Sequence, residues 1–267
     1  MNEKTPDKSV KFLVAITFSI MIIMNALANI LPINGRGTGE VSDSYANLFA
    51  PAGITFSIWG VIYFLLALYT LFQFGVFQAK SAGGNKRLLS RIGVIFSISS
   101  IANTLWILAW HYDRIFIALI LMLVILVCLI AINLLTRNAV LSAKERLFIR
   151  LPFSVYFGWI TVATIANVTT LLVGMGWKGA GMSEVLWTVL IILVGAVIGI
   201  VTMFSFRDMA YGIVLIWAYS GILLKHVSET GFDSEYTMVI ITVVTCIVLF
   251  ILAQGYLLFS KKKGLRK

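Results

Sequence analysis

The sequence predicts an all-α fold, a polytopic membrane helix bundle with eight transmembrane helices. Eight apolar runs each approach the length of about 20 residues that one helix needs to cross a bilayer. The runs cover residues 12–31, 54–77, 92–110, 115–135, 151–173, 185–206, 209–224 and 236–259. With 60% hydrophobic and 12% charged residues, the chain of 267 residues has too few polar side chains to coat a soluble globule.

Charges flanking the runs predict how the chain threads the membrane. If the N-terminus is cytoplasmic, the cytoplasmic segments collect 17 basic residues and the outer segments only 4. The positive-inside rule expects this asymmetry, so we expect a multi-pass protein of the cell membrane with both termini in the cytoplasm. The basic residues behind the net charge of +10 set the orientation of the chain and attract the anionic head groups of the lipid bilayer. We therefore expect no nucleic-acid partner.

The first run and the connection after it each allow two interpretations. Ala26-Leu27-Ala28 could end a cleavable signal peptide. The length of the run, together with Asn25 and Asn29, favours a retained helix. The connection over residues 32–53 mixes turn residues with acidic and apolar ones. It fits a lid over the mouth of a bundle and an ordinary solvated loop equally well.

The later runs differ in how clearly they read as spans. The third and fifth runs carry both tryptophan and asparagine, and the fourth carries Asn133. The sixth contains Gly195 and Gly199, a spacing that permits close approach of another helix. The seventh is short and only Arg207-Asp208 separates it from the sixth, so a re-entrant or tilted pair is the alternative there.

Residues able to carry catalysis are few. The two histidines, His111 and His226, lie at outer helix ends without metal-ligand spacing, and we expect solvated caps. No acidic residue lies well inside an apolar run, which argues against a buried proton relay. Cys128 and Cys246 fall inside apolar runs and fit buried free thiols. We therefore expect no catalytic residue and no metal site, and a protein that is not an enzyme.

Aromatic and amide side chains are what the membrane interior does offer. A flat, mostly apolar ligand needs ring faces for stacking and a few hydrogen-bond donors for orientation. The alternative is that tryptophan forms interfacial belts and asparagine joins helices. We expect Trp110, Trp177 and Trp187 to be belt residues, and composition leaves Trp59, Trp106 and Trp159 open between the two roles.

Three segments resemble the tryptophan-rich sensory protein family, TspO/MBR, which includes the mitochondrial translocator protein. Residues 51–63, PAGITFSIWGVIY, resemble the signature that opens its second helix. Residues 103–106, NTLW, and 159–167, WITVATIAN, are similar to its third-helix and fifth-helix motifs. The order and helix placement agree, and the resemblance covers about residues 10–173.

This resemblance implies a five-helix bundle over residues 1–173 that binds porphyrins or other flat hydrophobic ligands in a pocket closed by the first loop. By the same resemblance, the candidate ligand-binding residues come from the second, third and fifth helices. They are Trp59, Tyr63, Asn103, Trp106, Trp159, Ala163, Thr164 and Asn167. A bound porphyrin or another tetrapyrrole is the one cofactor that the resemblance suggests.

Two departures from the family pattern affect these expectations. The family usually has an aromatic residue six positions before Trp59, where this chain has Gly53. This difference weakens the expectation of a porphyrin-modifying activity without excluding one. Residues 174–267 add three helices and a basic cytoplasmic tail, which we predict as a second domain. The main expectation is a ligand-binding or sensory protein, and the alternative is a transporter of a small hydrophobic molecule. A homodimer stays open.

Overall fold

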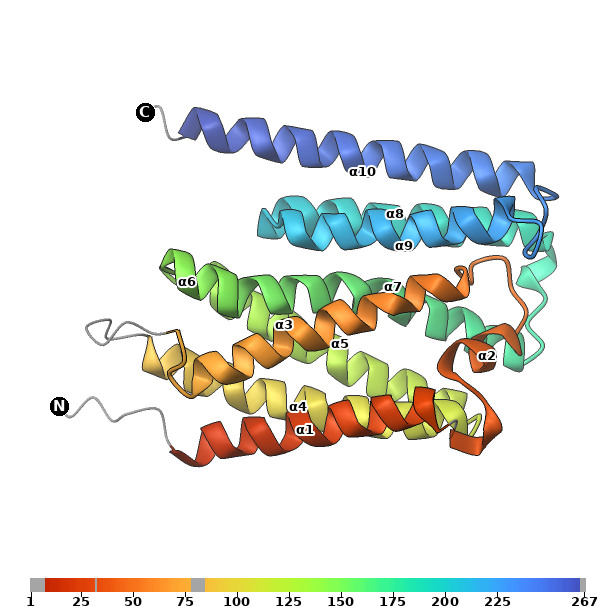
Figure 1. Cartoon of the computed structure of the whole chain (residues 1–267). Coiled ribbons are helices and arrows are strands. Elements are labelled where there is room, and N and C mark those ends of the chain that lie inside the picture. The colour runs from red at the N-terminus through yellow and green to blue at the C-terminus, as the bar shows by residue number, and fades with distance from the viewer. Residues whose placement is uncertain (1–7, 32, 78–84, 265–267) are drawn as a thin grey trace. The chain divides into compact units, whose positions relative to one another are not determined.

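The computed structural model describes residues 8–31, 33–77 and 85–264, and within these ranges the secondary structure is helical, without strands (Figure 1). The long helices are α1 (Lys8–Ile30), α3 (Ile58–Gln73), α4 (Lys86–His111), α5 (Ile115–Arg137), α7 (Leu151–Gly174), α8 (Glu184–Phe206), α9 (Met209–Val227) and α10 (Thr237–Gly264). The short elements are η1 (Ile33–Gly35), α2 (Thr38–Asp43), η2 (Gly53–Ser57), α6 (Ala143–Glu145), a π-helical turn η3 (Arg146–Arg150) and η4 (Gly179–Gly181).

The predicted all-α bundle with eight spans is confirmed: eight helices in the described ranges are long and apolar enough to cross a membrane. In lipid every backbone polar group must be satisfied within the segment, which is why each apolar run forms a helix. Lys4, Lys80, Arg266 and Lys267, which contribute to the predicted charge asymmetry, lie outside the described residues.

Helix boundaries differ from the apolar runs where charged residues belong to a helix. α4 begins at Lys86 rather than near residue 92, because its first two turns carry basic residues that an apolar criterion excludes. α9 is an uninterrupted helix of 19 residues, so the re-entrant alternative is not what the structure shows. Arg207 reverses the chain in the left-handed region at φ 48°, and the Asp208 side chain caps α9 by accepting from the Tyr211 N–H at 3.2 Å.

The chain divides into two compact units. Unit 1 comprises Met1–Val41 and Trp59–Phe157, and unit 2 comprises Ser42–Ile58 and Gly158–Lys267. The division falls within α7, between Phe157 and Gly158. The domain boundary near residue 173 that the sequence suggests stays a prediction.

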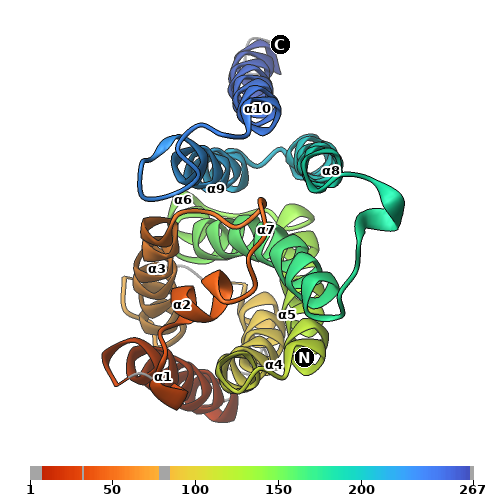
Figure 2. The same cartoon turned by 90° about the vertical axis from the view of Figure 1, so that its right-hand side faces the viewer.

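Unit 1 is organised around α4, which packs between α1 and α5 (Figure 2). Three mutually contacting aromatic rings join α3, α4 and the start of α7. Tyr69 lies 5.4 Å from Phe96 and 4.7 Å from Phe153, and the last two are 5.4 Å apart, all between ring centroids and edge to face. This geometry favours aromatic pairs beyond their buried area and fixes the three helices in register beneath Tyr156, one turn further along α7.

Unit 2 contains α10 packed on both α8 and α9 (Figure 2). Its segment 42–58 is attached to α9 at three points. The Ala52 N–H donates to the Gly221 carbonyl at 3.0 Å, the Trp217 indole donates to the Thr55 carbonyl at 3.0 Å, and His226 Nε2 donates to the Leu48 carbonyl at 2.9 Å. η2 and the chain before it are thereby fixed against α9.

The connection between the first two spans is packed in part, which fits an ordinary solvated loop poorly. In unit 1, Val41 is fully buried. In unit 2, Leu48 and Phe49 are 3% and 1% exposed. Apolar residues that alternate with acidic ones along this segment are turned inward, so it covers protein surface instead of extending into water. Its role as a lid stays a prediction.

Candidate functional site

Four of the predicted ligand-binding residues come together in unit 1. Trp59 and Tyr63, one turn apart on α3, stack with ring centroids 5.4 Å apart and planes at 19°. An i, i+4 spacing places two side chains on the same face of a helix, which explains the pairing. The Trp59 ring also lies 6.3 Å from Trp106 of α4 and 5.9 Å from Tyr156 of α7, edge to face in the second case. We call Trp59, Tyr63, Trp106 and Tyr156 the aromatic group.

A chain of buried amides and a phenol lies beside the aromatic group. The Asn25 amide of α1 donates to Asn103 Oδ1 at 2.8 Å, and the Asn103 amide donates to the Tyr156 hydroxyl at 3.1 Å. All three residues are 5% exposed or less. Since each bond joins a different pair of helices, the chain sets the rotation of α1, α4 and α7 about their axes. The Tyr156 hydroxyl accepts here and keeps its own proton for donation.

Tyr63 supplies the polar atom in the aromatic group that is not satisfied. Its hydroxyl is buried and has no hydrogen-bond partner in the described part of the chain. Leaving a buried hydroxyl unsatisfied costs about 1–3 kcal/mol. A polar edge of a bound molecule that reached this hydroxyl would remove that cost, so Tyr63 can orient a ligand as well as stack on it.

The outer end of α4 is buried, contrary to two expectations from the sequence. Trp110 is 4% exposed, stacks on Trp106 at 5.7 Å and donates to the Thr38 carbonyl at 3.1 Å, so it is not a belt residue. His111 is fully buried rather than a solvated cap. Its Nδ1 donates to the Ile33 carbonyl at 3.1 Å, and its Nε2 forms a hydrogen bond with the Thr38 hydroxyl, also at 3.1 Å.

The other four predicted residues lie in unit 2, on α7. Trp159 is 3% exposed, and its ring meets that of Phe56 edge to face at 5.9 Å. Thr164 donates its hydroxyl proton to the Ile160 carbonyl at 2.7 Å, and the Asn167 amide donates to the Ala163 carbonyl at 3.0 Å. Both bonds run back along the helix itself. The hydroxyl of Thr164 therefore has only its oxygen lone pairs left for another molecule.

Sequence reasoning did not select Asn25, Tyr156 and Phe56 for the site, although each contacts a residue that it selected. A helical spacing could have indicated two of them: Phe56 precedes Trp59, and Tyr156 precedes Trp159, by three residues in the chain. Asn25 had no such signal, because its contact with Asn103 depends on how α1 is rotated against α4.

The position of Gly53, where the resembling family carries an aromatic residue, is open. A Cβ added to Gly53 would meet no atom within 4 Å. The missing aromatic ring is therefore not replaced locally by another side chain. Among the described residues, no three His, Cys, Asp or Glu side chains gather closely enough to hold a metal ion.

The fold and the interior of unit 1 define an integral, multi-pass membrane protein of helices, with an aromatic group and hydrogen-bonded amides inside the bundle. The sequence model of the family described as TSPO-like protein matches residues 11–256, and the chain belongs to this family. The match continues through α8 and α9 into α10, so it includes helices beyond the predicted resemblance over residues 10–173. No curated protein and no solved structure matches the chain.

Proposed function

We propose that the protein binds a flat hydrophobic ligand, such as a porphyrin, against the aromatic group of unit 1 and acts as a receptor or sensor for it. The observation that carries the proposal is the unsatisfied hydroxyl of Tyr63 within a group of rings that contact Trp59. A flat ligand gains stacking energy from the ring faces, and Tyr63 supplies a hydrogen bond that fixes its orientation.

Binding rather than catalysis is the proposed activity. The side chains that contact Trp59 and its neighbours in the aromatic group include phenols, indoles and the amide of Asn103. Such groups stack and hydrogen-bond, and they do not serve as general acids or bases near neutral pH. The ligand is therefore expected to leave the protein chemically unchanged.

A titration of the detergent-solubilised protein with protoporphyrin IX tests the proposal. Quenching of tryptophan fluorescence and the shift of the porphyrin absorption band both report binding. Stacking contributes about 0.5–1.5 kcal/mol beyond buried area, and the buried area is lost as well, so Trp59→Ala should weaken binding by roughly tenfold or more.

Trp177→Ala is the matched control, because it also removes one tryptophan but at a residue that is 47% exposed. It should leave the affinity unchanged. Equal affinities for the unmodified protein, Trp59→Ala and Trp177→Ala would show that the aromatic group is only packing.

We further propose that the protein resides in the cell membrane with both termini in the cytoplasm. The support is the asymmetry of 17 basic residues against 4 across the predicted sides. Reporter fusions after Lys267 and within residues 78–91 should both report the cytoplasm. An external signal from either fusion would overturn this orientation.

A further inference from the structure

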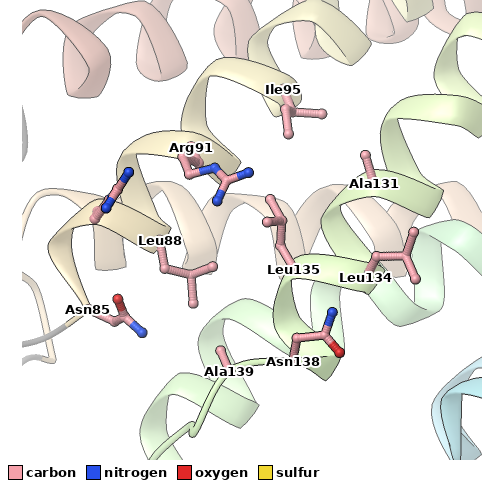
Figure 3. Close-up of a pocket in the computed structure, with 10 residues that line it drawn as sticks. Asn85, Leu88, Arg91, Ile95, Ala131, Leu134, Leu135, Asn138 and Ala139 are labelled. Carbon is pink, nitrogen blue, oxygen red and sulfur yellow. The ribbon is translucent and has the colours of Figure 1, made fainter.

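A cavity that is separate from the aromatic group opens between α4 and α5, where α4 begins and α5 ends (Figure 3). Its volume is about 690 Å³, within the range of small-molecule sites. The residues that line it are Asn85, Arg87, Leu88, Arg91, Ile95, Ala131, Leu134, Leu135, Asn138 and Ala139. We call this cavity the α4–α5 cleft.

The lining of the α4–α5 cleft changes from polar to apolar along the helices. Arg87, Arg91 and the two asparagines lie toward the helix ends, and the aliphatic side chains of Ile95 and Ala131 lie further toward the middle of the helices. Figure 3 shows the Arg91 side chain extending from α4 toward the part of α5 that carries Leu135. A ligand that fits must therefore carry a polar head and an apolar tail.

The charge of the cleft is positive. Arg87 and Arg91 are one helical turn apart and exposed, and neither forms an ion pair within the described ranges. No acidic residue is among those that line the cleft. Glu145 approaches from the rim, 3.5 Å from the Asn85 N–H, but its carboxylate already forms the capping box with Ser142.

Helix dipoles do not alter this balance, because the start of α4 and the end of α5 contribute partial charges of opposite sign. The two guanidinium groups therefore decide what binds, and guanidinium groups favour phosphate oxygens.

The depth of the cleft in the bilayer matches the same chemistry. α4 and α5 are both long enough to span the membrane, and the arginines lie in the first two turns of α4. The ends of spanning helices lie at the level of the lipid head groups, with acyl chains beside the residues further inside. Basic pockets between transmembrane helices at this depth suit anionic lipids.

We propose that the α4–α5 cleft binds an anionic phospholipid. The phosphate would lie between Arg87 and Arg91, and the part of an acyl chain nearest the head group would lie along Leu88, Ile95 and Leu135. Asn85 and Asn138 provide amide groups to the polar head. The site is independent of the porphyrin proposal, since it shares no residue with the aromatic group.

The test measures lipid binding by native mass spectrometry of the delipidated, detergent-solubilised full chain. Phosphatidylglycerol, phosphatidylcholine and inorganic phosphate are titrated separately, the last as a competitor of phosphatidylglycerol. We expect phosphatidylglycerol to bind more tightly than phosphatidylcholine, and inorganic phosphate not to displace it. Equal binding of the two lipids, or displacement by phosphate alone, would overturn the proposal, the latter in favour of a free-phosphate site.

Three variants locate the binding. The double variant Arg87→Gln/Arg91→Gln should weaken phosphatidylglycerol binding by roughly 30-fold, given the usual contribution of each basic residue at a membrane surface. Ala131→Phe keeps every charge but places a phenyl ring in the apolar part of the cleft, and it should weaken the binding of phosphatidylglycerol. Arg114→Gln, an exposed arginine before α5 at the other end of the pair, should bind as the unmodified protein does. Retained binding in both cleft variants would show that the lipid binds elsewhere.

Discussion

The interiors of the two units are built from different kinds of contact. Inside unit 1, side chains meet side chains, as in the chain of hydrogen bonds from Asn25 through Asn103 to Tyr156. Unit 2 also has contacts between side chains, such as Trp159 with Phe56, but it adds close contacts at glycines. A Cβ added to Gly158 would lie 2.9 Å from the Tyr211 carbonyl oxygen, and one added to Gly199 would lie 2.5 Å from Leu215.

Among the glycines described in unit 1, only Gly93 has neighbours closer than 3.4 Å to an added Cβ. Unit 2 places Gly158, Gly195, Gly199, Gly212 and Gly221 in such contacts. Without a hydrophobic driving force between helices in lipid, close packing at small residues stabilises their association. The comparison indicates that unit 2 gains stability where helix backbones approach closely at glycines. The interior of unit 1 instead contains the aromatic and amide side chains that we propose to bind a ligand.

The largest effect should come from filling the glycine contacts of unit 2. In the double variant Gly195→Leu/Gly199→Leu, the new side chains would collide with Tyr219 and Leu215. Overpacking at two sites should lower the free energy of unfolding by about 3 kcal/mol or more, a fall in Tm of about 6–12 °C.

Thermal unfolding of the detergent-solubilised protein measures this fall. Gly255→Leu on α10 is the control, since a Cβ there meets nothing within 4 Å. A Tm for the double variant equal to that of Gly255→Leu would mean that the glycine face points to lipid.

The next effect concerns Trp159, the aromatic residue of unit 2 in the predicted site. If it contributes to ligand binding as Trp59 does, Trp159→Ala should weaken protoporphyrin IX binding by roughly tenfold, from the loss of stacking and buried area. The titration described for Trp59 measures it. A full-strength affinity in Trp159→Ala, with a weakened one in Trp59→Ala, would assign ligand binding to unit 1 alone.

A smaller effect is expected where unit 1 is held by its amides. Asn103→Ala removes both the acceptor for Asn25 and the donor to Tyr156, at a cost of about 1 kcal/mol, typical of hydrogen bonds between membrane helices. Thermal unfolding should show a fall in Tm of about 2–4 °C. Asn29→Ala changes an exposed residue whose side chain, among the described residues, bonds to the Asn25 carbonyl of its own helix, and it should change little. An equal fall in both variants would count against the inter-helix role.

The smallest effect has the opposite sign. Gly60 on α3 has no atom within 4 Å of an added Cβ, so Gly60→Ala should stabilise the helix by about 0.5–1 kcal/mol. A slightly raised Tm would confirm that Gly60 does not allow another helix to pack closely against α3. A lowered Tm would show that this face of α3 is covered by another helix, as the glycines of unit 2 are.

The sequence predicts the helices well, because an apolar run in lipid has no alternative backbone structure. Its predictions weaken where two helices meet. The i, i+4 spacing of Trp59 and Tyr63 forecasts their stacking, but the bond between Asn25 and Asn103 depends on helix rotation, which neither helix encodes alone. Likewise, Thr164 could have turned its hydroxyl outward, and its rotamer on α7 gives the proton to the helix backbone instead.

The chain contains only two histidines, and each is fully buried beneath a different part of the connection between the first two spans. His111 is bonded to residues 33–38 and His226 to Leu48. An acylating reagent for imidazole, such as diethyl pyrocarbonate, can reach His111 only after the segment bonded to it moves away. It can reach His226 after movement either of the segment at Leu48 or of the rings of Phe232 and Tyr236, which also contact it. Chemical footprinting of two peptides would therefore report separately how often the surroundings of each histidine open.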